Sequence, residues 1–460
     1  MNNQIIILEV NEIAGPIMDR FMAEGKLPAL ERMKRESGIF STTTDSTGAL
    51  NPWVQWVSFN HGISATQHCA KFLGDDSTVE GTPFWDIGGK GRTSVVQFPM
   101  NGRYSKHVEV FVSDLWSESP IVFPEKLKRF YEFSRSAVHS QPTDSKWKTL
   151  SQGLSILPFL TSCSLGPKFF ALALRQVLLE RVRPVVWNRV CLFEKMSWRV
   201  FSAMCSSHDV QLGVYFSNTI AYLQHRYWHF LQPELFDNSL TKRRSAPPAI
   251  LTGYLELDGE ISELERRMPD ATIVLVSALG QVPHLNAKVA YVPKSIDEVI
   301  RVLKIPVPLR LNKLMAEQFR FEFESQEALL ECQAELDECH VGTAMLFQTT
   351  SSGTSMLVKC GIHTTVELGK VIDNGRGVEV PFFELFTLLS VKTGQHDETG
   401  ILWIREPERQ HYQSPTPIPL VDAGRTLKNC LKSDPRSNLE LVNNLRLALE
   451  SNERNSAALG

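Results

Sequence analysis

The sequence has few of the features that mark a secreted, membrane-spanning or nucleic acid-binding protein. It contains no run of about 18 apolar residues, the length that a spanning helix needs. Its opening, MNNQIIILEV, has no basic segment ahead of a long apolar stretch, so we expect no signal peptide. Basic side chains are not in excess, because 48 Lys and Arg stand against 51 Asp and Glu, and the formal net charge is −3. This balance argues against nucleic acid as a partner but leaves open a small anionic substrate, which needs only a local positive site.

Cysteine is scarce and scattered. The eight cysteines form no Cys-x-x-Cys pair, so we expect neither a disulfide framework nor a cysteine–zinc site. A reducing cytoplasm is the location that fits this usage. Internal repeats and low-complexity tracts are also absent. What the chain does have is 43% hydrophobic residues over 460 positions, enough for a substantial core.

Short apolar runs alternate with segments of helical character. The runs are too continuous for half-exposed antiparallel strands and favour a parallel sheet covered on both faces. Strands alternating with helices predict a doubly wound α/β fold. The expected strands are Ile5–Val10, Val95–Phe98, Val108–Val112, Val214–Phe216 and Thr272–Ser277, and the expected helices include Pro16–Ser37, Tyr222–Phe230 and Leu251–Met268.

Two regions interrupt this alternation and are expected to be insertions. Residues 121–205 are rich in helix formers and carry the apolar segments LPFLTSC and FFALALRQVLLERV. We expect them to cap the sheet edge, or to touch a membrane surface through 152–182 as an interfacial helix would. Residues 285–375 suggest a small α+β unit. The core would then comprise 1–120, 206–284 and 376–433, with a C-terminal helix and tail over 434–460.

Several motifs occur in an order that is typical of one family. IIILEVNEIAGPIMDRFMAEGKLPAL opens the chain, and NPWVQWVSFNHGISATQHCAKFLGD follows. VYFSNTIAYLQHRYWHF, TIVLVSALG, KTGQHDETGILWI and IPLVDAGRTLKNCL come later. Together they resemble the opening strand, nucleophile helix, "D-x-x-x-H-x-x-W", "SDHG", "G-x-H-x-x-x-G" and "DIAPT-x-L" segments of type I phosphodiesterase/nucleotide pyrophosphatase proteins, in the alkaline phosphatase superfamily. The resemblance implies an alkaline phosphatase-like, mostly parallel α/β sheet with helices on both faces.

The same resemblance implies a two-metal site that this chain has largely lost. In the family, three aspartates and three histidines hold two zinc-like ions about 4 Å apart, and a threonine or serine attacks a phosphate or sulfate ester. Two of the histidines survive, as His225 and His396. The remaining ligand positions fall on Asn11, Ala221, Ala278 and Leu279.

The attacking residue is missing too. Its position falls on Pro52 or Asn51, neither of which has a hydroxyl. The nearest hydroxyl residues are Ser46, Thr47 and Ser58. An ordinary two-metal phosphodiesterase site is therefore not expected.

The residues that remain still suggest a site. His225, His396 and Glu12 would suit one divalent, zinc-like ion with an open position, and Glu12 or His225 could act as general base. Asn51 before Pro52 predicts a helix start that favours an anion and a catalytic role for Asn51. Asn11, Gln55, His61, Arg226 and Gln281 are the expected substrate-binding residues, with Arg226 suited to a phosphate or carboxylate.

Simpler readings of these residues stay open. Each histidine could be a hydrogen-bonded structural residue, Asn51 a helix cap alone, and Glu12 half of a surface ion pair. Two classes of function follow. The first is a hydrolase or transferase acting on a phosphate- or sulfate-type ester, glycan- or lipid-linked, with one metal ion or none. The second is a catalytically inactive relative that binds an anion, a sugar or a protein partner.

Overall fold

A ten-stranded, mostly parallel sheet forms the centre of the molecule. The computed structural model describes residues 4–44, 50–139, 146–180, 186–236, 247–314, 317–433 and 440–459. Its strands lie in the order β19-β2-β18-β7-β1-β6-β3-β4-β5, with β20 also paired to β2. Strands β7, β1, β6, β3 and β4 run parallel, while β18 runs antiparallel to both of its neighbours. The bounds are β1 (Ile5–Val10), β2 (Gly38–Thr43), β3 (Ser94–Gln97), β4 (Val110–Val112), β5 (Val122–Phe123), β6 (Leu212–Ser217), β7 (Thr272–Ser277), β18 (Thr399–Arg405), β19 (Tyr412–Gln413) and β20 (Ile418–Pro419).

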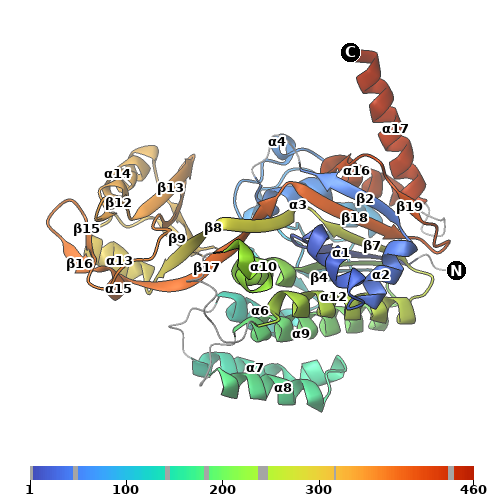
Figure 1. Ribbon diagram of the computed structural model, residues 1–460, viewed down its shortest axis with the longest axis horizontal. Helices are drawn as coiled ribbons and strands as arrows, with labels where there is room; N and C mark the ends of the chain where they lie inside the picture. The colour runs from blue at the N-terminus through green and yellow to red at the C-terminus, as the bar shows by residue number, and fades with distance from the viewer. Residues whose placement is uncertain are drawn as a thin grey trace.

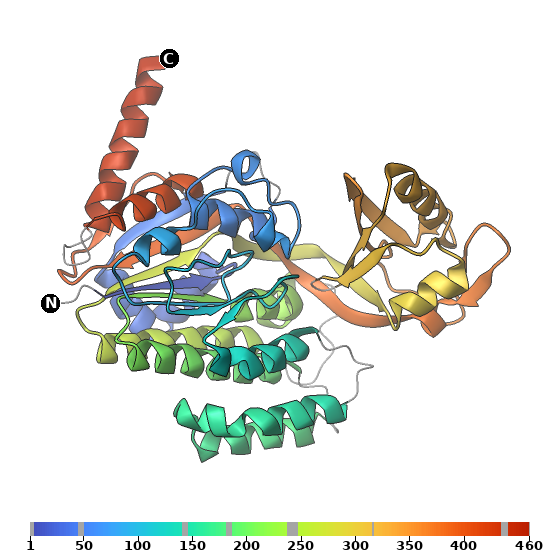
Figure 2. The same cartoon turned by 180° about the vertical axis from the view of Figure 1, so that it is seen from behind.

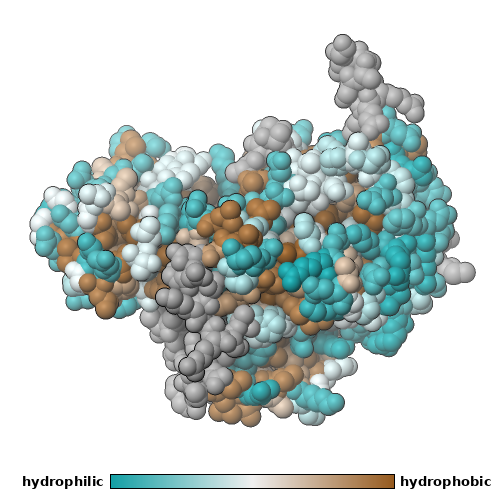
Figure 3. Space-filling view, viewed as in Figure 1, coloured by the Kyte–Doolittle hydropathy of each residue, from teal (hydrophilic) through white to brown (hydrophobic). Residues whose placement is uncertain are grey.

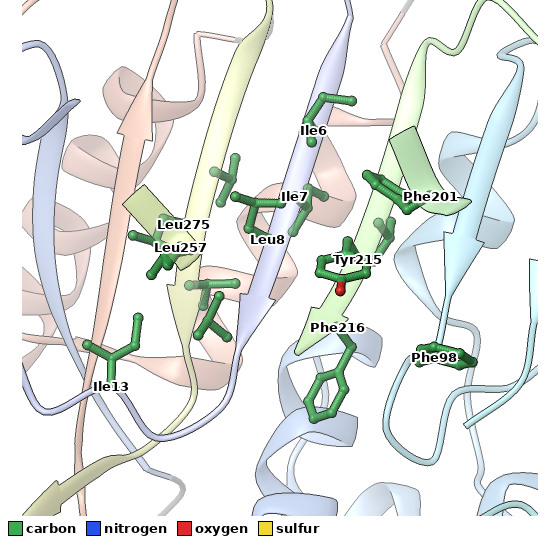
Figure 4. Close-up of a cluster of buried hydrophobic side chains, with 14 of the residues drawn as sticks. Ile6, Ile7, Leu8, Ile13, Phe98, Phe201, Tyr215, Phe216, Leu257 and Leu275 are labelled. Carbon is green, nitrogen blue, oxygen red and sulfur yellow. The ribbon is translucent and has the colours of Figure 1, made fainter. Parts of the chain in front are cut away.

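The central strands are buried along their whole length. Every residue of β1, β6 and β7 is buried, as continuous apolar strands between two helical layers should be. Figure 4 shows Ile6, Ile7 and Leu8 of β1 among the aromatic and aliphatic side chains of this core. The doubly wound α/β fold predicted from the sequence is confirmed.

Helices cover both faces of the sheet (Figure 1). One layer contains α1 (Gly15–Ala23), α2 (Pro28–Arg35), α9 (Val186–Ser207), α10 (Thr219–Leu231) and α12 (Ala249–Arg267). The other contains α3 (Pro52–His61), α5 (Phe84–Gly88) and α16 (Leu420–Cys430), with α4 (Ala65–His68) following α3. The last helix, α17 (Leu441–Leu459), begins against α16 and projects from the molecule at the C-terminal end (Figures 1 and 2).

A long antiparallel ribbon, β8 (Gly280–Pro293) with β17 (Phe386–Asp397), leaves the core and carries a smaller α+β domain (Figure 1). That domain has its own hydrophobic cluster, separate from the main core. It comprises α13 (Ile296–Leu303), β9 (Arg310–Lys313), β10 (Gln318–Glu322), α14 (Gln326–Asp337), β11 (His340–Val341), β12 (Ala344–Met345), β13 (Phe347–Ser352), β14 (Ser355–Cys360), β15 (Val371–Asp373), β16 (Glu379–Pro381) and α15 (Phe382–Leu385).

The apolar helices of the first irregular region form an outer layer. The helix α6 (Lys128–His139) packs on α7 (Lys146–Ser162), and α8 (Pro167–Leu179) packs on α9. Both α7 and α8 lie beyond α9, on the face of the sheet that α9, α10 and α12 cover (Figure 1). Within the part of the chain that the structure describes, no helix is long and apolar enough to cross a membrane.

Candidate functional site

Glu12 is the centre of the site. It lies directly after β1, the strand between β6 and β7, where the carboxyl ends of the parallel strands meet. Its backbone is in the left-handed region, with φ of 58°, a conformation that costs a non-glycine residue about 1 kcal/mol or more. The neighbouring backbone holds it there, because the Asn11 amide donates to the Ser217 carbonyl and the Ile13 amide donates to Ser277 Oγ. The turn directs a buried carboxylate over the sheet edge.

Four nitrogen atoms surround that carboxylate. Oε1 accepts a hydrogen bond from Asn11 Nδ2 at 2.9 Å and lies 3.3 Å from His396 Nε2. Oε2 accepts a hydrogen bond from Gln281 Nε2 and lies 2.9 Å from His225 Nε2. Each carboxylate oxygen therefore faces one amide and one imidazole.

Backbone carbonyls fix both histidines. His225, on α10, has its Nδ1 at 2.8 Å from the Gly394 carbonyl, and His396, on β17, has its Nδ1 at 2.5 Å from the Leu50 carbonyl. Because a carbonyl can only accept, each Nδ1 carries the proton and each Nε2 is left toward Glu12. This second interaction is the one that orients metal-binding histidines in proteins.

The electrostatics of the cluster follow from this packing. Burial alone would raise the pKa of Glu12, but the imidazoles of His396 and His225 outweigh it and hold that pKa well below its ordinary value. Burial lowers the pKa of His396, yet Glu12 and the Leu50 carbonyl outweigh burial, so that the pKa is raised. Glu12 is therefore an anion at neutral pH.

Asn11 supports Glu12 rather than facing the open side. Its Nδ2 donates both to Glu12 and, at 2.8 Å, to Asn218 Oδ1. Its Oδ1 accepts from Trp56 Nε1 at 2.8 Å. The amide oxygen that the sequence offers in place of an aspartate is thus directed at α3, and the amide nitrogen orients the carboxylate.

The N-terminal end of α3 lies at the site, and its C-terminal end lies away from it. Asn51 is its N-cap and Pro52 its first residue, and the preceding Leu50 carbonyl is the partner of His396. Gln55 is fully buried within α3. His61 ends the helix, roughly 15 Å along its axis from Asn51, with its Nδ1 3.1 Å from the Val57 carbonyl. Burial lowers the pKa of His61 to about 3, so it is a neutral core residue there.

Arg226 and Ser58 also have partners away from Glu12. The Arg226 guanidinium lies 4.2 Å from the centre of the Tyr222 ring and donates to its hydroxyl at 2.8 Å. Ser58 Oγ is 2.9 Å from His68 Nε2. Ser46 and Thr47 lie outside the described residues. No hydroxyl nucleophile can be assigned among the residues that the structure describes.

The other positions at which the sequence resemblance implies metal ligands carry apolar side chains. Ala221, Ala278 and Leu279 are buried in the core. The nearby Ser277 hydroxyl donates to the Leu279 carbonyl at 2.7 Å and accepts from the Ile13 amide. These side chains offer no charge and no ligand atom for a second ion.

Some residues of the site were not predicted. Gln224 Nε2 donates to the Glu12 carbonyl at 2.6 Å, and its Oε1 accepts from Tyr254. Asn218 and Trp56 hold Asn11. A Cβ on Gly394 would lie 2.7 Å from the Gln224 carbonyl oxygen, which is backbone and cannot move aside cheaply, so only glycine fits there. Gly394, two positions before His396, was the one residue of this group that a sequence motif marked. The contacts of Gln224, Asn218 and Trp56 join segments that are distant in the sequence, so no local pattern predicts them.

Glu12, His225 and His396 are able to hold a metal ion. Their ligand atoms lie within 4.8 Å of one another, and they are the one such group of three in the part of the chain that is described. The fit rests on the two Nε2 atoms and the carboxylate oxygens that face a common region. The histidine side chains are about a quarter exposed, at 27% and 26%, while Glu12 is 2% exposed, so the group opens on one side.

Similar solved structures extend along nearly the whole chain. They include phosphonoacetate hydrolase from Sinorhizobium meliloti 1021 with phosphonoformate, at 11% identity and a TM-score of 0.42, covering 94% of this chain and 96% of that one. Murine ectonucleotide pyrophosphatase/phosphodiesterase 5 has 8% identity, a TM-score of 0.42 and coverages of 95% and 96%. A mutant of alkaline phosphatase PafA has 9% identity, a TM-score of 0.43 and coverages of 93% and 95%.

No protein-family model matches the sequence, and the search of curated proteins finds no match. Likenesses at these scores support no statement about the reaction. The structure itself places Asn11, Glu12, His225, Gln281 and His396 together at the carboxyl edge of a mostly parallel sheet. With its motifs in family order and this sheet between two helical layers, the chain is a divergent protein of alkaline phosphatase-like fold.

Proposed function

We propose that Glu12, His225 and His396 bind a single divalent metal ion, and that the chain hydrolyses or transfers a phosphate- or sulfate-type ester there. The observation that carries the proposal is the pair of histidines whose Nδ1 atoms are held by backbone carbonyls while both Nε2 atoms face Glu12. Two imidazoles and one carboxylate with an open side are a common ligand set of catalytic zinc. Bound there, the ion would polarise the ester and favour ionisation of a water molecule.

The residues of the chain would divide the remaining tasks. Asn11 and Gln281 orient the carboxylate, and the Gly394 and Leu50 carbonyls orient the imidazoles. Because Asn51 and Pro52 occupy the position of the family nucleophile, water or a hydroxyl of the substrate would attack. A small anionic or glycan-type ester is the substrate class that we propose.

Metal content is the first test. Protein purified without chelator should contain about one equivalent of divalent ion, measured by plasma mass spectrometry, and zinc titration of the stripped protein should show one site. His225→Ala and His396→Ala should each lose that ion while keeping their circular dichroism spectra. His411→Ala, at an exposed histidine, is the matched control. A parent protein that binds no divalent ion, or histidine variants that bind it like the parent, would reject the metal site.

The reaction is tested separately on the loaded protein. Nitrophenyl esters of phosphate, of a phosphate diester and of sulfate distinguish the three ester classes. Turnover of one of them that disappears with Glu12→Gln and survives in His411→Ala would support the enzyme. Bound metal without turnover of any ester would leave the metal site standing and reject the hydrolase on these substrates.

A second candidate is a non-catalytic anion-binding protein, and one observation favours it. The Glu12 carboxylate already has four nitrogen partners, so an ion pair with a protonated His396 satisfies the cluster without a metal. The open side next to the start of α3 would then bind an anion. Calorimetric titration of the chelator-treated protein with inorganic phosphate is the test. Binding that is lost in His396→Ala and absent from zinc-loaded protein would favour this candidate over the first.

A further inference from the structure

The helix α8 buries a polar side chain and exposes several apolar ones. Its Gln176 is 3% exposed, whereas Leu174 and Leu178 of the same helix are 61% and 51% exposed. An ordinary surface helix turns its apolar stripe to the core and its polar side chains to water. Here the polar side chain faces the protein and the leucines face outward.

The side of α8 that faces the protein is polar where it meets α9, while Phe169 and Phe170 near the start of the helix pack against the main core. Gln176 donates to Glu180 Oε1 at 2.8 Å and accepts from Asn188 Nδ2 at 2.7 Å. Arg189 on α9 forms an ion pair with Glu180. This polar seam fixes the rotation of α8, so the outward direction of its leucines is a defined feature.

The outward face is a continuous stripe. Ala171, Leu174, Val177 and Leu178 follow the spacing that places residues on one side of a helix. Ala171, Leu174, Val177 and Leu178 are exposed and Phe170 is half-buried. In the space-filling view, hydrophobic surface gathers at the lower edge of the molecule, over α7 and α8 (Figure 3).

The charge around the stripe has one dominant sign. Lys168 and Arg175 are seven residues apart, so they lie on the same side of α8, next to the apolar stripe, and both are exposed. Within α8 itself the charged residues are these two, and none is acidic, although the net charge of the chain is −3. Glu180 is already paired with Arg189. An apolar stripe beside basic side chains is the pattern of a helix that lies in the headgroup region of an anionic membrane.

We propose that α8 docks the protein on an anionic phospholipid bilayer, with Leu174, Val177 and Leu178 in the interface and Lys168 and Arg175 toward the headgroups. The helix is about 20 Å long and lies parallel to the surface rather than across it. This surface is separate from Glu12 and its partners, so the proposal does not depend on the function proposed for them.

Vesicle co-sedimentation of the full chain tests it. The protein should bind vesicles of phosphatidylcholine mixed with phosphatidylglycerol more tightly than vesicles of phosphatidylcholine alone, and added salt should weaken the binding. Leu174→Ser with Leu178→Ser should weaken it by about tenfold or more. Lys168→Gln with Arg175→Gln should weaken it by a similar factor on the anionic vesicles. The matched control is Leu309→Ser with Leu368→Ser, two leucines of the small domain that are 60% and 90% exposed, which should bind like the parent.

The other outcomes overturn the proposal. Equal binding to both kinds of vesicle would remove the role of Lys168 and Arg175. Equal loss in the Leu309 and Leu368 control pair would remove the role of the apolar stripe of α8. Sedimentation velocity without lipid tests whether the protein self-associates. If the parent self-associates through Leu174 and Leu178 and ignores vesicles, the stripe is an interface between two copies. A monomer that binds neither vesicle would also reject the membrane proposal.

Discussion

Asn11 shows how a single neutral side chain changes the requirements of the proposed metal site. Its Nδ2 donates to Glu12 and its Oδ1 accepts from Trp56. Asn11→Asp would replace the Nδ2 donor with a carboxylate oxygen, which places a second negative charge beside Glu12. We expect the metal-free variant to lose about 1–3 kcal/mol of unfolding free energy, since a buried donor is lost and like charges meet.

Added zinc should recover that loss, because a cation offsets both carboxylates, and zinc should bind the variant more tightly than the parent. Thermal unfolding of stripped and zinc-loaded protein measures both effects. A variant as stable as the parent without metal would contradict the role assigned to the Asn11 amide.

Glu9, the next-to-last residue of β1, gives a prediction about the pH dependence of stability. Burial raises its pKa to about 8 from an ordinary 4.5, and the nearby Asn60 amide opposes the rise only in part. The folded state therefore holds this proton more tightly than the unfolded chain does. The stabilisation that this provides is complete below pH 4.5 and is lost as the pH rises toward 8.

Glu9→Gln removes this dependence. The variant should gain stability relative to the parent as the pH rises from 5 to 8, by an amount on the order of a few kcal/mol. Urea unfolding of both proteins across that range gives the difference at each pH. A difference that does not change with pH would show that Glu9 does not titrate in the folded protein.

At the scale of elements, one glycine sets the packing of α3 on α16. A Cβ on Gly424 would lie 2.0 Å from the Phe59 carbonyl oxygen, which is backbone and cannot move aside cheaply. Gly424→Ala should therefore cost about 1–3 kcal/mol through overpacking. The control is Gly259→Ala on the exposed side of α12, where nothing lies within 4 Å. That change should be neutral or stabilising by up to about 1 kcal/mol, because alanine favours helix.

Denaturant unfolding of the two variants measures both changes. Because α3 supplies the Leu50–Asn51 end of the site, Gly424→Ala should also weaken zinc binding, which Gly259→Ala should not. Equal stability of the two variants would mean that the two helices can move apart freely.

The elements themselves were the predictable part of the molecule. Strands β1 and β7 match the expected ranges because continuous apolar runs of this length leave little choice but a buried parallel strand. His225 and His396 were predicted to be neighbours from motif resemblance, and their ring centres lie 5.1 Å apart. Glu12 was proposed from its place after β1.

The rest of the site could not be predicted, for physical reasons. His61 stands next to a motif glycine in the sequence, but it is the last of the ten residues of α3, at the end of the helix remote from Asn51. Arg226 follows His225 directly, and helical geometry turns it about 100° away, toward Tyr222. The backbone carbonyls of Leu50 and Gly394 could not be predicted as partners of the histidines, because every residue type has a carbonyl.

For the whole molecule, Arg320 is a main link between the small domain and the core. It lies on β10 and is nearly buried. It pairs with Asp75 at 2.7 Å and with Glu118 at 3.1 Å, and both of these residues belong to the main α/β domain. Arg320→Ala would leave these carboxylates without their partner. We expect the domain to become more mobile, visible as faster proteolysis within β8 and β17 and a larger radius of gyration in X-ray scattering.

Arg301→Ala is the control, because Arg301 pairs only across an exposed turn of α13 with Glu298. It should leave both measurements unchanged. Unaltered proteolysis and scattering in the Arg320 variant would show that the ribbon alone holds the domain in place.

The ribbon has a mechanical consequence. Gln281 and His396 are cross-strand partners at its root, and the small domain is attached to its far end (Figure 1). The two strands are paired along most of their length, so they are expected to move together. Gln281 and His396 both contact Glu12, so we expect a rotation of the small domain that moves the ribbon to shift the two side chains on either side of this carboxylate.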